Sequence, residues 1–251
     1  MTRTVTVQEI VAILATQGQT PSVINAEFLK YSGIIPNDWE LVRQPIYTEE
    51  VAQIAYNTNV TVTVQPNRIV VAQALEDQIT DDLVGTQIAR KLATALPKVN
   101  YRAFGFNAIG YVPFPEGKTA IYHYLNQTLL APGPWQDFKG ASVDPAFEFA
   151  YNLPQGRLSL SAREAVLRKR EQVEDGLPIV SFTGTIEHVL NQTESSARLE
   201  ALMGCLDNWQ NDLQTYTDLV NNYFLHALPT AEPPALTDYT SQSLDRVGAP
   251  A

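Results

Sequence analysis

The chain has 251 residues, of which 45% are hydrophobic and 18% are charged, and its formal net charge at pH 7 is −10. This length accommodates one large domain or two modest ones. The acidic balance argues against general nucleic-acid binding, which requires a basic surface, and against docking on an anionic membrane. We therefore expect neither nucleic acid nor a membrane as a partner.

The start of the chain and its single cysteine bear on the cellular compartment. Cys205 has no second cysteine to pair with, so no intramolecular disulfide can form. The first residues lack a basic segment followed by an apolar run, and no apolar stretch approaches the ~20 residues of a membrane span. These features predict a cytoplasmic protein.

Residues 1–20 contain the first predicted element. Thr6 and Glu9 have the spacing of a capping box, in which each side chain bonds the backbone of the other. Apolar residues follow at Ile10, Val11, Ile13 and Leu14, and Gly18 follows them. This order predicts a short amphipathic helix that ends at the glycine.

The next region predicts strands. Val60, Val62 and Val64 alternate with polar residues, and a turn at 66–67 leads into residues 68–74, which is typical of a β-hairpin. The remaining elements of this region are a strand within 49–56, a helix at 81–96 capped by Asp81 or Asp82, and a strand at 101–112.

A similar order of elements follows in the second part of the chain. We expect a helix at 119–130, alternating strand residues around Phe149, a hairpin strand at 157–173 and a strand at 177–189. The chain therefore predicts an α+β domain over 21–228, with a twisted antiparallel sheet. Its two halves, 21–98 and 99–228, each read as a β-β-β-α unit. Residues 229–251 are polar and proline-rich, which predicts a disordered tail.

A heptad pattern dominates the C-terminal region. Its apolar positions are Leu199, Leu202, Leu206, Trp209, Leu213, Tyr216, Val220, Tyr223 and Ala227. The spacing predicts one helix over 195–227, about 50 Å long at 1.5 Å per residue. The flanking positions are half apolar, which favours packing across the protein's own sheet over a coiled-coil dimer. A homodimer through this helix or through sheet edges is compatible with the same pattern.

Motifs for chemistry are missing from the sequence. There is no phosphate-binding glycine loop, no nucleophile elbow and no metalloprotease motif. His123, His188 and His226 are too far apart for a local metal site. Acidic pairs such as Glu49 and Glu50 lack a second catalytic residue type beside them. The sequence thus favours a protein without cofactor, metal or catalytic residues.

Basic residues are concentrated in one predicted strand. Five of the chain's 17 basic residues lie there, namely Arg157, Arg163, Arg168, Lys169 and Arg170. In an acidic protein, such a cluster indicates a docking site for an acidic partner. The alternative is an edge strand whose charges prevent aggregation.

Aromatic residues crowd the middle of the sequence and suggest a second kind of site. An apolar ligand pocket between sheet and long helix would be lined by Arg102, Phe104, Phe106, His123, Trp135 and Phe149. The alternative is that these side chains fill an ordinary core.

Three features together resemble a known pattern. Residues 100–107 (Asn-Tyr-Arg-Ala-Phe-Gly-Phe-Asn), the hairpin segment 157–160 and the closing long helix are similar to a family of uncharacterised, sporadically distributed bacterial proteins. The chain also looks cyanobacterial. Arg102 corresponds to a recurring arginine of that pattern, which would pair with a carboxylate inside the sheet. The resemblance implies no activity.

Two functions are compatible with these observations. The first is a non-catalytic cytosolic protein that binds another protein as an assembly factor, adaptor or regulator. The second is a binder of a small apolar ligand, or a cofactor-free enzyme, that uses the aromatic cavity.

Overall fold

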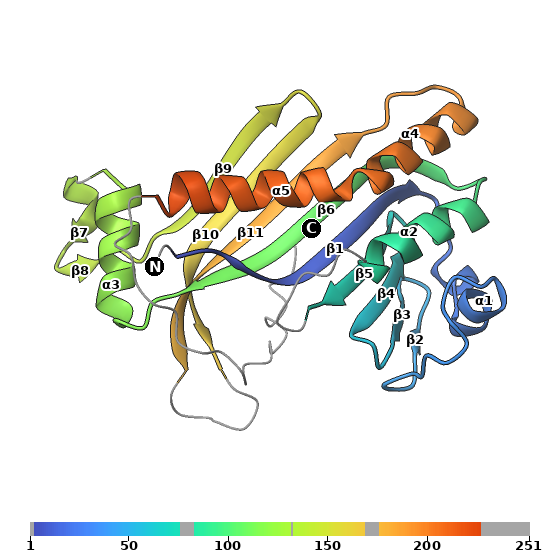
Figure 1. Cartoon of the computed structure of the whole chain (residues 1–251), viewed down its shortest axis with the longest axis horizontal. Helices are drawn as coiled ribbons and strands as arrows, with labels where there is room; N and C mark the ends of the chain where they lie inside the picture. Colours follow the sequence, from blue (N-terminus) through green and yellow to red (C-terminus); the bar gives the residue numbers. More distant parts are fainter. Residues whose placement is uncertain (1–2, 76–82, 132, 169–175, 227–251) are drawn as a thin grey trace.

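The computed structural model describes residues 3–75, 83–131, 133–168 and 176–226 (Figure 1). The predicted helix caps Asp81 and Asp82, the basic residues Lys169 and Arg170, and the predicted tail at 229–251 lie outside these residues. The described chain is an α+β protein built on one large antiparallel sheet.

The sheet has nine strands in the order β2-β3-β4-β5-β1-β6-β11-β10-β9, and every neighbouring pair is antiparallel. In sheet order, the strands are β2 (Ile46–Tyr47), β3 (Ala52–Ala55), β4 (Val60–Gln65), β5 (Arg68–Ala74), β1 (Thr6–Gln17), β6 (Asn100–Pro113), β11 (Leu177–Val189), β10 (Gly156–Leu167) and β9 (Ala146–Leu153). The two predicted hairpins, β4–β5 and the one that leads into β10, are confirmed.

The predicted N-terminal helix is wrong, because Thr6–Gln17 forms β1, a central strand between β5 and β6. Ile10, Ala12 and Leu14 are buried on one face of the strand. Over so short a stretch, apolar residues at 10, 11, 13 and 14 fit both the helical period of about 3.6 residues and the strand period of about two. The β-branched Val7, Ile10, Val11 and Ile13 favour the extended form, and partners on both sides provide the backbone hydrogen bonds.

The three longest helices, each of ten residues or more, pack on one face of the sheet, which we call the helix face (Figure 1). The described α-helices are α1 (Ala26–Tyr31), α2 (Val84–Ala95), α3 (Lys118–His123), α4 (Ser195–Asp207) and α5 (Trp209–Asp218). Two π-helical segments, η2 (Tyr124–Leu129) and η4 (Leu219–Phe224), continue α3 and α5. A short 3₁₀ turn η1 (Pro21–Val23) precedes α1, and a second, η3 (Pro134–Gln136), precedes the two-stranded ribbon of β7 (Asp137–Phe138) and β8 (Ala141–Ser142).

The single C-terminal helix expected at 195–227 is divided into α4, α5 and η4. The interruption lies at Asn208, whose backbone angles of φ −98° and ψ 14° leave the helical region. Asparagine is a poor helix former, and a heptad pattern records side-chain spacing rather than local backbone geometry. The run of segments still crosses the helix face, so the core lies between it and the sheet (Figure 1).

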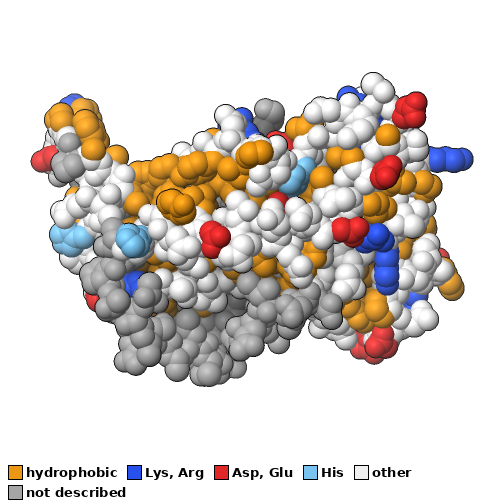
Figure 2. All heavy atoms as spheres, turned by 45° about the horizontal axis from the view of Figure 1, so that its top comes forward, with side chains coloured by type: hydrophobic (Ala, Val, Ile, Leu, Met, Phe, Trp, Pro, Cys, Tyr) orange, Lys and Arg blue, Asp and Glu red, His pale blue; other side chains and the backbone are white. Residues whose placement is uncertain are grey.

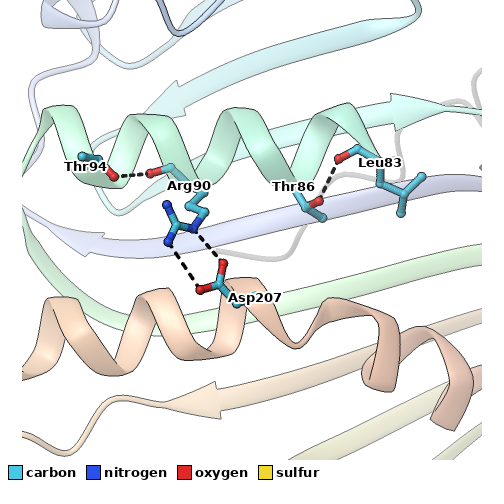
Figure 3. A network of polar contacts seen from close by, with 5 residues as sticks. All are labelled: Leu83, Thr86, Arg90, Thr94 and Asp207. Atoms are coloured by element: carbon cyan, nitrogen blue, oxygen red, sulfur yellow. Dashed lines mark hydrogen bonds and ion pairs between the residues drawn. The ribbon is translucent and has the colours of Figure 1, made fainter. Parts of the chain in front are cut away.

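Close contacts fix this run against the sheet. The ring of Tyr216 lies where a side chain on Gly184 would be, 2.4 Å from the expected Cβ position, and its hydroxyl donates to the carbonyl of Phe182 at 3.0 Å. Glycine at this position therefore lets α5 approach the strands closely. Arg90 of α2 bonds both carboxylate oxygens of Asp207 in α4, at 2.7 and 3.4 Å (Figure 3).

The two β-β-β-α halves remain a prediction. Strands from both halves join one continuous sheet, and β1, which was assigned to neither half, lies between them.

Candidate functional site

The candidate binding surface of the described chain is the edge strand β9. It has eight residues and pairs with β10 on one side, while no described strand pairs with it on the other. Only one of its residues, Glu148, is charged. Natural sheets usually protect a long edge with charges, prolines, bulges or a covering segment. A long, weakly charged edge is therefore a candidate binding surface.

The strand register identifies the backbone groups at this edge. Leu153 pairs with Gly156 across the two-residue turn Pro154–Gln155, so this pair is hydrogen-bonded. Because hydrogen-bonded and non-bonded pairs alternate along an antiparallel ladder, the even-numbered residues of β9 direct their N–H and C=O groups away from β10. These residues are Ala146, Glu148, Ala150 and Asn152, and all four are exposed.

The odd-numbered side chains of β9 form an aromatic row on the helix face. Phe147 and Phe149 stack with ring centroids 5.8 Å apart, and Phe149 meets Phe224 of η4 edge-to-face at 5.0 Å. Phe147, Phe149 and Tyr151 are only partly buried. Figure 2 shows hydrophobic side chains, in orange, gathered on the upper part of the molecule, next to the projection at the upper left. The core thus reaches the surface at β9 and is left incompletely covered.

Three of the five basic residues proposed for partner binding are described. Arg157 and Arg163 are exposed and share the outer face of β10, opposite the helices, whereas Arg168 is exposed just beyond the strand end. Arg157 lies between Asn152 of β9 and Glu187 of β11. The strand β10 that carries these arginines is the second strand from the edge, because β9 pairs with it as far as Arg163. Beyond Arg163, β11 is the one described strand that pairs with β10.

The six residues proposed for a ligand pocket divide into three that belong to or pack against the core and three that lie at the surface. Phe104 and Phe106 are buried in the core, Phe149 lies on β9, and Arg102, His123 and Trp135 are exposed. A surface hollow of about 470 Å³ lies elsewhere, lined by residues 17–19 and 95–100, and includes none of the six.

A buried polar pair lies close to the β9–β10 turn. His188 of β11 and Asp212 of α5 are 7% and 0% exposed, and Nε2 of the histidine is 2.8 Å from Oδ2 of the aspartate. Nδ1 of His188 lies 2.9 Å from the carbonyl oxygen of Gln155 in the turn, and its ring stacks on Phe104. The pair therefore connects the helix, the sheet and the turn that precedes β10.

The geometry favours the protonated form of His188. The Gln155 carbonyl only accepts hydrogen bonds and a carboxylate oxygen of Asp212 lies at the other ring nitrogen, so the two partners favour an imidazole in which both nitrogens donate. The hydrogen bond to Asp212 raises the pKa of His188, the aspartate's charge and the Gln155 carbonyl raise it further, and burial opposes them. Burial also raises the pKa of the neighbouring Cys205 thiol, with a contribution from the charge of Asp212.

Gly156 explains how the turn approaches so closely. A Cβ at this position would lie 2.2 Å from the carbonyl oxygen of Glu187 and 3.5 Å from Nδ1 of His188. Contacts this short require a residue without a side chain.

Sequence reasoning did not identify the His188–Asp212 pair or the free edge. The pair joins residues 24 positions apart through tertiary packing, which no spacing rule reveals. The alternation of aromatic and small residues in β9, with a single charge, was visible in the sequence as a signal for the edge.

No protein-family model matches this chain, and no curated protein matches it significantly. The resemblance to the uncharacterised bacterial family therefore stays a prediction. In the described parts of the chain, no group of three or more His, Cys, Asp or Glu residues is arranged to hold a metal ion. None of the helices in those parts combines the length and apolar character needed to span a membrane.

Proposed function

We propose that this protein binds another protein by accepting an extended segment at the free edge of β9. The observation that carries the proposal is the coincidence, on one strand, of outward-directed backbone groups and a partly covered aromatic row. In strand addition, the backbone groups supply affinity and the alternate side chains supply specificity. This assigns the protein to the adaptor, assembly or regulatory class rather than to the ligand binders.

The aromatic row supports the proposal energetically. A strand added beside β9 would place alternate side chains against the aromatic rings of Phe147, Phe149 and Tyr151, which are only partly buried. Burying apolar surface contributes roughly 25 cal/mol per Å². A partner with alternating apolar residues would therefore complete the edge of the core.

Proline at Ala150 gives a sharp test. Ala150 directs its N–H away from β10, so Ala150→Pro removes a free donor without removing a bond of the β9–β10 ladder. Ala150→Val is the matched control, because it keeps the donor and adds similar bulk. The probes are peptides selected against the wild-type protein from a displayed random library.

We expect the selected peptides to bind Ala150→Pro about tenfold more weakly than wild type, since one backbone hydrogen bond is lost. Ala150→Val should bind them with nearly wild-type affinity. Both variants are checked for unchanged unfolding in urea. Failure to select any peptide, or equal binding by the proline variant, would show that β9 is not a strand-addition site.

A further inference from the structure

The proposed strand-addition site has a basic residue at its flank, Arg163, that is unpaired among the residues that the structure describes. Arg163 lies on the outer face of β10, and its neighbours in register are Ala146 of β9 and Ser181 of β11. Within the described residues, Arg163 takes part in no ion pair and no side-chain hydrogen bond. Arg157 also takes part in no ion pair among the described residues, but the acidic residue Glu187 lies directly across from it on β11.

The small side chain of Ala146 leaves the path from Arg163 to the edge open. Neighbouring strands lie about 4.8 Å apart, so a strand added beside β9 would lie about two such spacings from β10. An arginine side chain extended over a methyl group covers much of this distance, and a carboxylate reaching back from the added strand covers the rest. Arg163 can therefore contact an added strand across Ala146.

Direction and register locate the complementary residue. Every strand pair in this sheet is antiparallel, and antiparallel pairing is slightly more stable per residue than parallel pairing. In that direction, the residue opposite Ala146 lies at the C-terminal end of the added segment. Glu148 occupies the next outer-face position, so an acidic residue opposite it would meet a like charge.

We infer, on the basis of the proposed function, that the partner is an extended segment that runs antiparallel to β9 and ends in an acidic residue. It carries apolar residues facing Phe147, Phe149 and Tyr151, and a carboxylate opposite Ala146 that Arg163 binds. The guanidinium is suited to this role because it offers several donors in a planar fork that matches a carboxylate. The acidic position thus sets the register of the bound segment.

Two synthetic peptides of the length of β9 test the inference. Both alternate valine with threonine, and they differ only in the last residue, which is glutamate in one and lysine in the other. Fluorescence anisotropy measures binding to wild type, to Arg163→Glu and to Arg157→Glu. The last variant is the matched control, because it makes the same charge reversal on the same face of β10.

We expect wild type to bind the glutamate peptide about three- to tenfold more tightly than the lysine peptide, the range of an exposed ion pair. Arg163→Glu should reverse this preference and Arg157→Glu should retain it, and high salt should reduce the difference.

Other outcomes separate the inference from the proposed function. If both peptides bind equally to all three proteins, and Ala150→Pro weakens both, strand addition stands and the acidic position is overturned. If neither peptide binds any of the proteins while library-selected peptides bind wild type, the acidic-ended segment is overturned and strand addition stands; if the selection also yields no peptide, both are overturned. A dimer of the free protein that Ala150→Pro dissociates would assign the edge to a second copy of the chain and would also overturn the acidic segment.

Discussion

The two edges of the sheet end in different ways. Towards β2 the strands shorten from seven residues in β5 to six, four and then two. Towards β9 they remain long, at thirteen residues in β11, twelve in β10 and eight in β9 (Figure 1). Shortening leaves few free backbone groups, which is one way proteins protect an edge. The β2 edge therefore has few free backbone groups with which another strand could pair, whereas the β9 edge has a longer row of them. We call them the terminated edge and the open edge.

Side-chain contacts show the same difference. Near β2, the hydroxyl of Tyr47 accepts from the backbone N–H of Ala26, so the chain around α1 lies against this edge. Near β9, the His188–Asp212 pair and Phe224 join the β9–β10 hairpin to the helical segments on the inner side. The β9 edge is therefore held in place by contacts on its inner side, while its outward backbone groups are unpaired among the described residues. A rigid docking strand requires this arrangement.

The largest expected loss of stability comes from breaking the buried His188–Asp212 pair. Asp212→Ala breaks the buried pair that joins α5 to β11, and removing one partner of a buried pair typically costs about 3–5 kcal/mol. The comparison at the other edge is Arg43→Ala, which removes an exposed hydrogen bond to Gln53 and should change stability by less than about 0.5 kcal/mol. Urea unfolding measures both. Similar losses for the two variants would contradict the view that internal support is concentrated at β9.

A somewhat smaller effect is expected at Phe224. Its ring contacts both Phe149 and Phe182, and Phe224→Ala should cost about 3 kcal/mol, the lower end for a phenylalanine near the rim of the core. Tyr223, the preceding residue, is 77% exposed, so Tyr223→Ala should cost less than about 0.5 kcal/mol. Thermal unfolding distinguishes the two, and equal costs would mean that the helix does not brace β9 through Phe224.

How much of this arrangement is predictable from sequence depends on the range of the interactions. The β4–β5 hairpin follows from local alternation and a turn, so the sequence predicts it correctly. The helix prediction for Thr6–Gln17 failed because the pairing partners of β1, β5 and β6, lie far along the chain. The free edge is equally non-local, since alternation identifies β9 as a strand but only the complete strand order places it last.

The pH dependence of stability should also differ between the two sides. Because the pKa of folded His188 is raised above its ordinary value of 6.5, the pair stabilises the fold fully below that pH. Its contribution is lost as the pH rises through the raised pKa. Near β3, burial together with Tyr47 raises the pKa of Tyr56 to about 12, so this phenol stays neutral throughout.

Wild-type protein should therefore lose stability on going from pH 6 towards pH 9, while Asp212→Ala should show a flatter profile over the same range. Urea unfolding at several pH values measures both profiles. A wild-type stability that rises through this window would contradict the cationic state of His188.

The smallest effect on stability, and the most direct test of the two edges, comes from adding one lysine to each. Ala150→Lys on β9 and Ile46→Lys on β2 both change exposed positions, so each should alter unfolding by less than about 0.5 kcal/mol. A lysine on an edge strand opposes pairing with another chain. Light scattering of concentrated protein during mild heating should show slower association for Ala150→Lys and no change for Ile46→Lys, because only the β9 edge is long enough to template a second strand. Equal protection by both lysines would mean that association proceeds through general surface charge and would remove the distinction between the terminated edge and the open one.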